Sequence, residues 1–242
     1  MKETVLITGA NKSLGLETAR QLLAKGGYFV YIGSRDINRG TDAVNQLKSE
    51  GFTDVEVLQI DVTDAQSIEQ AAKTLAAKTP HLDVLVNNAG IPGGFPQEAS
   101  LVTQENIRTV FDTNFFGVIQ TTQAFIPLLK KAAVPRVVNV SSDLGSLDNH
   151  SNPEWRHYDV KLTAYCASKT ALNAYTVMLA YEFKDAGFKV NSVNPGYTAT
   201  DFNNHTGYKT VEEGAEPIVK YATVGSEGPT GKFFSAEGET GW

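Results

Sequence analysis

Cysteines, long apolar runs and targeting signals are scarce or missing in this sequence. One cysteine among 242 residues excludes an internal disulfide bond, which is consistent with a reducing compartment. No apolar run approaches the ~18 residues that a membrane-spanning helix requires. The first residues enter a predicted strand at once, without the apolar core of a signal peptide. We therefore expect a cytoplasmic protein that does not bind membranes.

Positive charge and two common catalytic signatures are also missing. The 21 Lys and Arg residues are outnumbered by 27 Asp and Glu residues, which gives a net charge of −6 and argues against nucleic-acid binding. No Gly-x-Ser-x-Gly pattern indicates a nucleophilic serine, and no metal site is predicted. Hydrophobic residues make up 41% of the chain, enough for a sizeable core. Since no repeat or linker divides the sequence, residues 1–242 are predicted to form a single domain.

Apolar runs that read as strands alternate with helical patterns along the chain. Strands are predicted at 4–8, 28–32, 55–60, 82–86, 135–142, 190–194 and 229–235. Helical patterns begin at 16 and cover 43–47, 67–78, 104–131, about 163–186 and 211–222. This alternation predicts βαβ units and an α/β fold with a doubly wound, mostly parallel sheet. Ligands of such sheets bind at the carboxyl ends of the strands.

A glycine-bearing turn joins the first predicted strand to the first helix. It reads Gly9-Ala-Asn-Lys-Ser-Leu-Gly15 and includes Asn11, Lys12, Ser13 and Leu14. Glycines let the backbone approach a pyrophosphate, and the helix N-terminus supplies free N–H groups and a partial positive charge. The spacing is not the Gly-x-Gly-x-x-Gly dinucleotide pattern, and a plain strand-to-helix turn is the alternative interpretation.

The end of the second strand carries cations where a dinucleotide's adenosine ribose is expected. Ser34 and Arg35 follow the strand, and Arg39 lies one helical turn further on. With Lys12 nearby, these side chains suit a 2′-phosphate, so the sequence favours NADPH over NADH. Asp36 could bind the ribose instead, and Arg39 could be a solvated charge on a helix face.

Polar residues follow three other strands, and one asparagine interrupts a helical pattern. Asp61 and the segment Asn87-Asn88-Ala89-Gly90 lie at predicted carboxyl ends of strands, and Ser142 follows the fifth. Asn114 falls within 104–131, although asparagine is a poor residue for a helix interior. Turn and cap chemistry are the alternatives for Asn88 and Ser142, and a kink or a water-bonded surface residue is the alternative for Asn114.

Tyr165 and Lys169 are four residues apart in a helical pattern, so their side chains lie on one helix face. A phenol has an ordinary pKa of about 10. A cation fixed nearby favours the phenolate and is expected to lower that value, which would make the pair a proton-transfer device. The alternative is a surface lysine on a helix whose tyrosine packs in the core, because so short a motif also arises by chance.

Taken together, these residues resemble the short-chain dehydrogenase/reductase family over essentially the whole chain. The matching pieces occur in family order: Thr8 to Gly15, Asp61-Val62, Asn87 to Gly90, Asn114, Ser142, Tyr165 with Lys169, and Pro195-Gly196. Within the family the chain looks most like the NADPH-dependent carbonyl reductases. The resemblance implies a seven-stranded Rossmann sheet and hydride transfer between NADPH or NADP+ and a small carbonyl or alcohol substrate.

The resemblance also implies a role for each matching residue. Tyr165 would donate a proton to the carbonyl oxygen, Lys169 would lower the phenol pKa and bind the nicotinamide ribose, and Ser142 would hold the carbonyl oxygen. Asn114 would fix a water in a proton relay. The remaining implied cofactor contacts are Asp61 and Val62 at adenine, Asn88, Ala89 and Gly90 along the cofactor, and Pro195, Gly196 and Thr198 near the carboxamide or phosphates.

Two departures from the family pattern bear on the site. Ser13 stands where the central glycine of the turn is expected, and the segment at about 143–160 is longer than in many relatives. This segment and the loop at about 197–208 are predicted to line the substrate pocket, with Trp155 and Tyr158 as candidate walls. Because of the extra length, Ser141 is an alternative to Ser142.

Three functions remain open from the sequence. The first is an NADPH-dependent carbonyl reductase, the second a non-catalytic NADP(H)-binding sensor or regulatory protein, and the third an NAD-linked alcohol dehydrogenase. Relatives often pair two long helices in dimers or tetramers, so a homo-oligomer is one expectation and a monomer the other.

Overall fold

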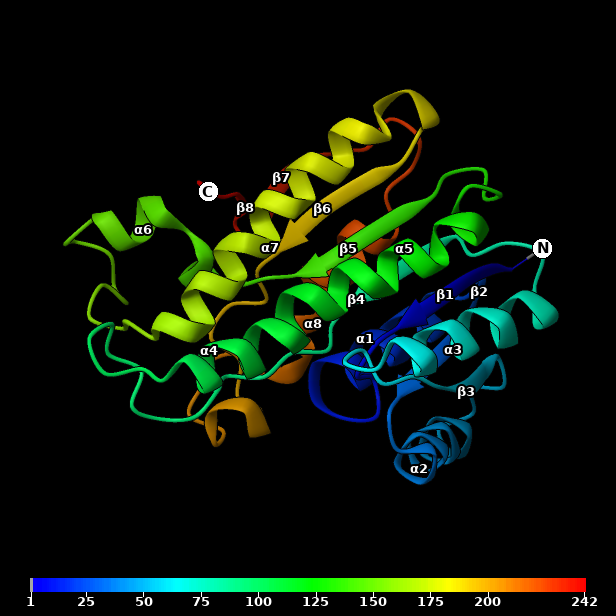
Figure 1. The fold of residues 1–242 in the computed structure, drawn as a ribbon. Coiled ribbons are helices and arrows are strands. Elements are labelled where there is room, and N and C mark those ends of the chain that lie inside the picture. Colours follow the sequence, from blue (N-terminus) through cyan, green and yellow to red (C-terminus); the bar gives the residue numbers. More distant parts are fainter. Residues whose placement is uncertain (1) are drawn as a thin grey trace.

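A computed structural model describes residues 2–242 as one twisted sheet with helices on both faces (Figure 1). The strands are β1 (Glu3–Ile7), β2 (Tyr28–Ser34), β3 (Val55–Gln59), β4 (Val84–Asn87), β5 (Arg136–Val140), β6 (Lys189–Val193), β7 (Lys232–Ser235) and β8 (Gly238–Glu239). Their order is β3-β2-β1-β4-β5-β6-β7-β8, and every pair is parallel except β7 with β8. The expectation of a doubly wound, mostly parallel sheet is confirmed.

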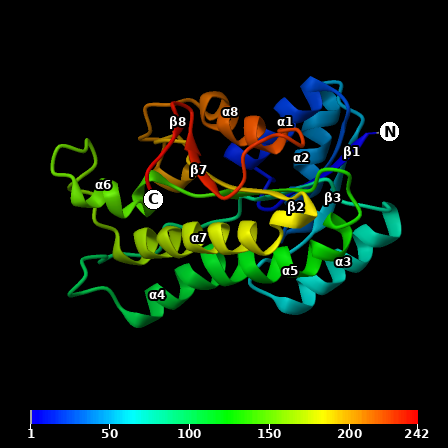
Figure 2. The same ribbon diagram turned by 90° about the horizontal axis from the view of Figure 1, so that it is seen from above.

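The helices cover the sheet in two layers. They are α1 (Ser13–Lys25), α2 (Ile37–Ser49), α3 (Ala65–Lys78), α4 (Gln104–Phe111), α5 (Gly117–Leu129), α6 (Leu147–Ser151), α7 (Thr163–Glu182) and α8 (Val211–Ala222). Figure 2 shows α1, α2 and α8 on one face and α3, α5 and α7 on the other. No helix within residues 2–242 combines the length and apolarity needed to cross a membrane.

The strands are apolar on both faces, which is why helices cover both. In β1, Val5 and Ile7 pack with the α1 and α8 layer, whereas Leu6 packs with the layer of α3 and α5. In β4, Val86 and Leu85 divide in the same way. Successive residues of a strand point to opposite faces, so a continuous apolar run supplies two cores. The chain reverses its order of strand addition between β1 and β4; in doubly wound sheets, ligands bind in the crevice outside the carboxyl ends of the strands at such a point.

The sheet has eight strands, and the expected number of seven is wrong by one. The chain turns after Ser235, and the two residues of β8 pair antiparallel with β7. A two-residue strand lacks the alternating pattern by which longer strands are found in a sequence.

The helix expected over 104–131 is also different in the structure. α4 and α5 are joined by a π-helical turn, Asp112–Phe116, which contains Asn114, and α5 ends at Leu129. A π-helical turn inserts one residue into the helix and is frequent at functional sites. The interruption therefore explains how an asparagine occupies the middle of an otherwise apolar helical pattern.

Three further segments differ from the expectation. The 143–160 segment, for which no strand or helix is predicted, begins with a 3₁₀ turn at Asp143–Gly145 followed by α6. α7 stops at Glu182, before a 3₁₀ turn at Lys184–Ala186. The loop at 197–208 contains a 3₁₀ turn at Asp201–Asn203. Figure 1 shows α6 and the chain after it beyond the carboxyl ends of β5 and β6, on the side of the crevice.

Candidate active site

The glycine turn between β1 and α1 forms a tight corner with free backbone donors. Gly9 has φ of +63°, and a Cβ on it would lie 3.0 Å from the Cα of Ala89. A Cβ on Gly15 would lie 2.8 Å from the Gly9 carbonyl oxygen. No side chain caps the first turn of α1, so N–H groups there are available to an anion. The residues present thus fit a bound pyrophosphate.

Ser13 occupies the left-handed region at this corner, with φ of +49°. Glycine adopts this conformation without a steric penalty, whereas a residue with a Cβ is strained. Ser13 therefore adopts the left-handed conformation that suits the expected glycine, and it does so with strain.

Lys12, which the sequence grouped with two arginines, pairs with an acidic residue of the 197–208 loop. Its Nζ lies 2.8 Å from Oδ2 of Asp201 in the 197–208 loop. Both side chains are about half exposed, at 59% and 50%, so the pair is weak and an anionic phosphate competes with Asp201 for the lysine. The contact places the 197–208 loop beside the glycine turn.

The end of β2 presents two exposed arginines, and the acidic residue between them is occupied. The Asp36 carboxylate caps α2 by accepting the backbone N–H groups of Asn38 and Arg39. Its other oxygen lies 3.5 Å from the Arg39 guanidinium. Ser34 is buried and donates its hydroxyl to the Asp36 carbonyl. Arg35, in contrast, forms no ion pair within the described residues 2–242, and the contacts of Asp36 count against it as a ribose ligand.

Two residues after β3 shape the next part of the crevice. The Asp61 carboxylate accepts hydrogen bonds from the backbone and the hydroxyl of Thr63, and so forms a turn. The carbonyl of Val62 packs against Gly117, where a Cβ would come within 2.7 Å of it. Both residues are thus fixed by their neighbours at the carboxyl end of β3.

The Asn88 to Gly90 segment is fastened to the end of β1. The Asn88 amide donates to the carbonyls of Thr8 and Gly9, at 2.9 and 3.2 Å, while the backbone N–H groups of Asn88 and Ala89 donate to the Thr8 hydroxyl. The Asn88 side chain therefore fixes the backbone at the start of the glycine turn. A Cβ on Gly90 would lie 3.6 Å from the Lys169 ammonium, so this segment reaches the face of α7 that carries the lysine.

Asn114 is fully buried in the π-helical turn and is not a water-bonded surface residue. Its side-chain oxygen accepts the Ile91 N–H at 2.8 Å, and its amide donates to the Ile91 carbonyl at 2.9 Å and to the Ser168 hydroxyl at 3.1 Å. The amide therefore joins the segment after β4 to α7.

Tyr165 and Lys169 project from the first turns of α7, and both are buried, at 8% and 4% exposure. The Lys169 Nζ lies 5.8 Å from the centre of the Tyr165 ring and donates to the Val140 carbonyl at 2.8 Å. β5 ends at this carbonyl, and Ser142 follows it. The structure thus brings these three residues together at one edge of the sheet, as the sequence predicts.

The two serines after β5 have different surroundings. Ser141 is buried, and its hydroxyl donates to the Asn173 side chain at 2.7 Å. Ser142 is less buried; its hydroxyl accepts the Leu144 N–H at 3.2 Å and donates to the Asp143 carboxylate at 3.3 Å. Ser142 also lies beside the Tyr165 phenol, and its greater exposure and this position favour it over Ser141.

The direction of the Tyr165 pKa differs from the expectation. Burial raises the pKa of the Tyr165 phenol well above its ordinary value, and the neighbouring Ser142 only partly opposes this effect. Burial also lowers the pKa of Lys169 to about 8. Desolvation penalises the charged form of both groups, so burial, and not the nearby lysine, sets the direction of the Tyr165 pKa shift. The phenol is protonated at neutral pH, which is the form that a general acid requires.

Aromatic side chains cover the site from the 197–208 loop. The Phe202 ring lies 5.3 Å from the Tyr165 ring at an angle of 61°. Tyr197 and Trp155 both lie beside His157, with ring centroids 6.0 and 5.5 Å from it. Trp155 therefore belongs to the wall that joins 143–160 to this loop.

Other residues near this wall have local roles. Tyr158, the second predicted wall residue, instead lies against the Lys161 ammonium. Thr198 is buried, with its hydroxyl near the carbonyls of Pro195 and Gly196, and Gly196 is left-handed with φ of +78°. These residues form the turn from which the 197–208 loop departs. The sequence contains no local signal that distinguishes Phe202 from other residues of this loop.

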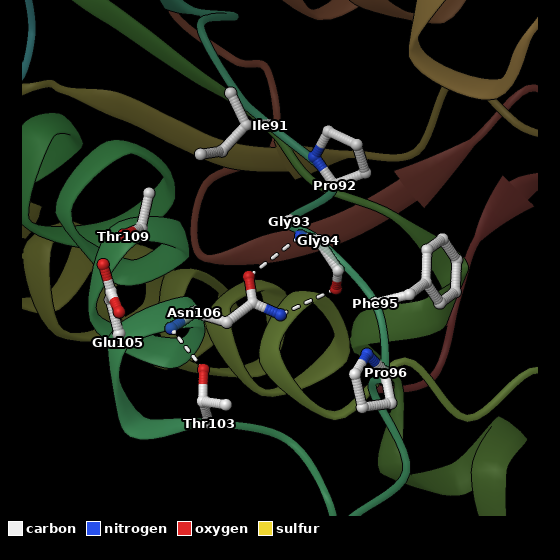
Figure 3. Close-up of a pocket in the computed structure, with 10 residues that line it drawn as sticks. All are labelled: Ile91, Pro92, Gly93, Gly94, Phe95, Pro96, Thr103, Glu105, Asn106 and Thr109. Atoms are coloured by element: carbon white, nitrogen blue, oxygen red, sulfur yellow. Dashed lines mark hydrogen bonds between the residues drawn. The ribbon is translucent and has the colours of Figure 1, made fainter.

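A surface cavity of about 480 Å³ lies beside the site, between residues 91–96 and α4 (Figure 3). Asn106 crosses it and pairs with both backbone groups of Gly94. The lining does not include Ser142, Tyr165 or Lys169, so this cavity is not the place where their polar atoms meet.

Comparisons with known proteins agree with this geometry. A family profile described as short chain dehydrogenase matches residues 3–210. A (+)-neomenthol dehydrogenase of Capsicum annuum is 33% identical over 95% of this chain and 94% of its own. A short-chain dehydrogenase of Penicillium roqueforti is 38% identical over 93% and 90%.

A solved structure is similar over its full length. The NADPH-bound carbonyl reductase from chicken fatty liver superposes with a TM-score of 0.87 and 27% identity, covering 100% of both chains. The profile match spans most of the sequence, and two relatives exceed 30% identity over nearly all of it. On this evidence the chain belongs to the short-chain dehydrogenase/reductase family.

Proposed function

We propose that this protein reduces the carbonyl group of a small ketone or aldehyde with NADPH. The observation that carries the proposal is the buried pair of Tyr165 and Lys169 beside Ser142, at the carboxyl edge of a sheet whose glycine turn fits a pyrophosphate. The names of the relatives support the same chemistry, since they include a (+)-neomenthol dehydrogenase and an NADPH-bound carbonyl reductase.

The residues divide the reaction between them. The hydride that reduces the carbonyl carbon would come from NADPH held by this chain, which would leave as NADP+. The Tyr165 phenol donates its proton to the carbonyl oxygen, which becomes the alcohol, while the Ser142 hydroxyl holds that oxygen. Lys169 lies close enough to stabilise the phenolate that remains. Asn114, whose amide oxygen accepts one protein hydrogen bond and whose amide nitrogen donates two, would fix a water of the proton relay.

The remaining residues of the crevice would hold the cofactor. Gly9, Asn11, Ser13, Leu14 and Gly15 would surround the pyrophosphate, and Lys12, Ser34, Arg35 and Arg39 would bind the 2′-phosphate. Asp61 and Val62 would contact the adenine, Asn88, Ala89 and Gly90 would line the middle of the cofactor, and Pro195, Gly196 and Thr198 would meet its nicotinamide end.

The first test is NADPH consumption with a panel of aldehydes, diketones and cyclic ketones. Turnover above a protein-free control supports the proposal. Tight NADPH binding without turnover on any compound would favour a sensor, and faster alcohol oxidation with NAD+ would favour an NAD-linked dehydrogenase. A cytoplasmic location and the choice among monomer, dimer and tetramer stay predictions.

Replacing Arg35 by alanine should reduce the preference for NADPH over NADH. Arg35 is exposed and makes no ion pair with any acidic side chain of residues 2–242, and a charge-assisted contact contributes roughly 1.5–3 kcal/mol. We expect kcat/KM with NADPH to fall about 10- to 100-fold and kcat/KM with NADH to change little. Lys48→Ala, which removes a cation at the other end of α2, is the matched control. Equal losses with both cofactors would contradict the assignment.

Phe202→Ala should weaken binding of ring-bearing ketones. The Phe202 ring lies against Tyr165 and is 40% exposed, so a substrate whose carbonyl meets the phenol also contacts this ring. Aromatic contacts contribute about 0.5–1.5 kcal/mol beyond burial of area. We expect KM for a cyclic ketone to rise about tenfold, while kcat/KM for a two-carbon aldehyde stays within about twofold. Parallel losses on both substrates would exclude a role in selectivity.

A further inference from the structure

The helix that carries Tyr165 begins without a capping side chain of its own. The N-cap position is Leu162, which cannot accept a hydrogen bond through its side chain. Instead, two backbone N–H groups of the first turn donate to Gln97, a residue 68 positions before Tyr165 in the chain. The Thr163 N–H reaches the Gln97 carbonyl at 3.1 Å, and the Tyr165 N–H reaches the side-chain oxygen at 3.3 Å.

Gln97 is itself held in one orientation. It is 2% exposed, and its side-chain nitrogen donates to the Pro92 carbonyl at 2.9 Å. A buried amide whose donor is engaged in this way presents its oxygen in a fixed direction. Here that direction is toward the backbone of Tyr165.

The segment that carries Gln97, residues 91–97, is fastened at two other points. Asn114 pairs with both backbone groups of Ile91, and Asn106 pairs with both backbone groups of Gly94 (Figure 3). Each asparagine makes two hydrogen bonds to one residue, as a neighbouring strand would. The support beneath Gln97 is therefore fixed by side chains of α4 and of the π-helical turn.

The contacts close into a ring around Tyr165. Its backbone carbonyl accepts the Ser168 hydroxyl at 2.7 Å, and that hydroxyl accepts from the Asn114 amide. Asn114 in turn holds Ile91, at the start of the segment that ends in Gln97. Both backbone polar groups of Tyr165 are thus bound by side chains that share one support.

From this ring we propose that Gln97 is a positioning residue for Tyr165. It touches no reacting atom, and it acts by fixing the backbone from which the phenol projects. A misplacement of about 1 Å at a reacting group can cost up to 10²-fold in rate. This assignment rests on the proposed reductase function and adds a residue to its machinery.

The test compares Gln97→Met and Gln97→Glu with the wild-type protein. Both variants lose the donor to the Pro92 carbonyl, so they differ in the acceptor alone. Methionine keeps the length and apolar bulk but removes the acceptor, whereas glutamate retains an oxygen for the Tyr165 N–H at a helix N-terminus, where a negative charge is favourable. We expect kcat to fall about tenfold in Gln97→Met with KM for NADPH unchanged, and to recover to within about threefold in Gln97→Glu. Gln104→Met, the same substitution at an exposed position, is the control.

A second readout does not depend on turnover. Hydrogen exchange of the backbone amides of residues 163–166 should be faster in Gln97→Met than in the wild type and in Gln97→Glu. Equal kcat in Gln97→Met and wild type, or equal losses in both Gln97 variants, overturns the proposal. If the wild type reduces no carbonyl compound, the proposed function fails, and unchanged exchange in Gln97→Met would overturn the positioning role separately.

Discussion

Tyr165→Phe is expected to lower kcat for carbonyl reduction by about a thousandfold and to leave NADPH affinity within about threefold. The substitution removes one oxygen and its proton from a buried ring. A positioned general acid contributes typically 10²- to 10⁴-fold in rate. Burial holds the pKa of this phenol above its ordinary value, so the wild-type group carries its proton throughout the neutral range. Steady-state kinetics with the best substrate of the panel measure the loss.

The matched control is Tyr181→Phe. Tyr181 lies on the same helix, about four turns beyond Tyr165, and its side chain is 69% exposed. We expect its kcat to equal that of the wild type. A Tyr165→Phe variant that keeps more than a tenth of the wild-type kcat, with an unchanged melting temperature, would show that another group donates the proton.

Local patterns in the sequence predict the fold and most of the site. Both cores come from continuous apolar runs, as in β1 and β4, and a parallel sheet places the ends of such runs at one edge. Helical spacing places Tyr165 and Lys169 on one face, and Ser142 follows a predicted strand, whereas the roles of these residues came from the family resemblance and stay predictions. These features depend on neighbours within a few residues, and that is why they can be predicted without a structure.

Contacts between distant residues could not be predicted in this way. Gln97 lies 68 residues before Tyr165, and Asp201 lies 189 residues after Lys12. Neither residue belongs to a motif, and nothing in the adjacent sequence indicates its partner. The short strand β8 and the left-handed conformation of Ser13 likewise follow from packing and turn closure rather than from residue preference.

The predicted direction of the Tyr165 pKa shift is wrong for a related reason. From the spacing alone, a lysine beside a phenol should lower its pKa. The structure buries both groups at the start of α7, and burial penalises each charged form by an amount that spacing does not reveal. Since the pKa of Lys169 is about 8, Lys169 loses its charge as pH rises above 8.

Lys169→Met should alter how the stability of the protein depends on pH. The pKa of Lys169 is about 8 in the folded protein, against an ordinary value of 10.5. The unfolded chain therefore binds more protons between pH 8 and 10.5, and the wild-type protein gains stability as pH rises through that window. Since 10.5 − 8 = 2.5 and one pKa unit corresponds to about 1.4 kcal/mol, the penalty below pH 8 is about 3 kcal/mol. Methionine has no charge to bury and removes this contribution.

Denaturant unfolding at pH 7 and pH 10 measures the effect. Relative to Lys169→Met, the wild-type protein should gain about 2–3 kcal/mol between these values, and the comparison cancels other groups such as Tyr165. Lys184→Met, at an exposed lysine just beyond α7, should show no such gain.

In the same pH range, wild-type carbonyl reduction should decline above pH 8 as Lys169 loses its charge, and Lys169→Met should be at least a hundredfold slower at pH 7. A wild-type difference that stays constant from pH 7 to 10 would mean that Lys169 is not a buried cation. In that case, stabilisation of the Tyr165 phenolate by a buried Lys169 cation would not be part of the mechanism.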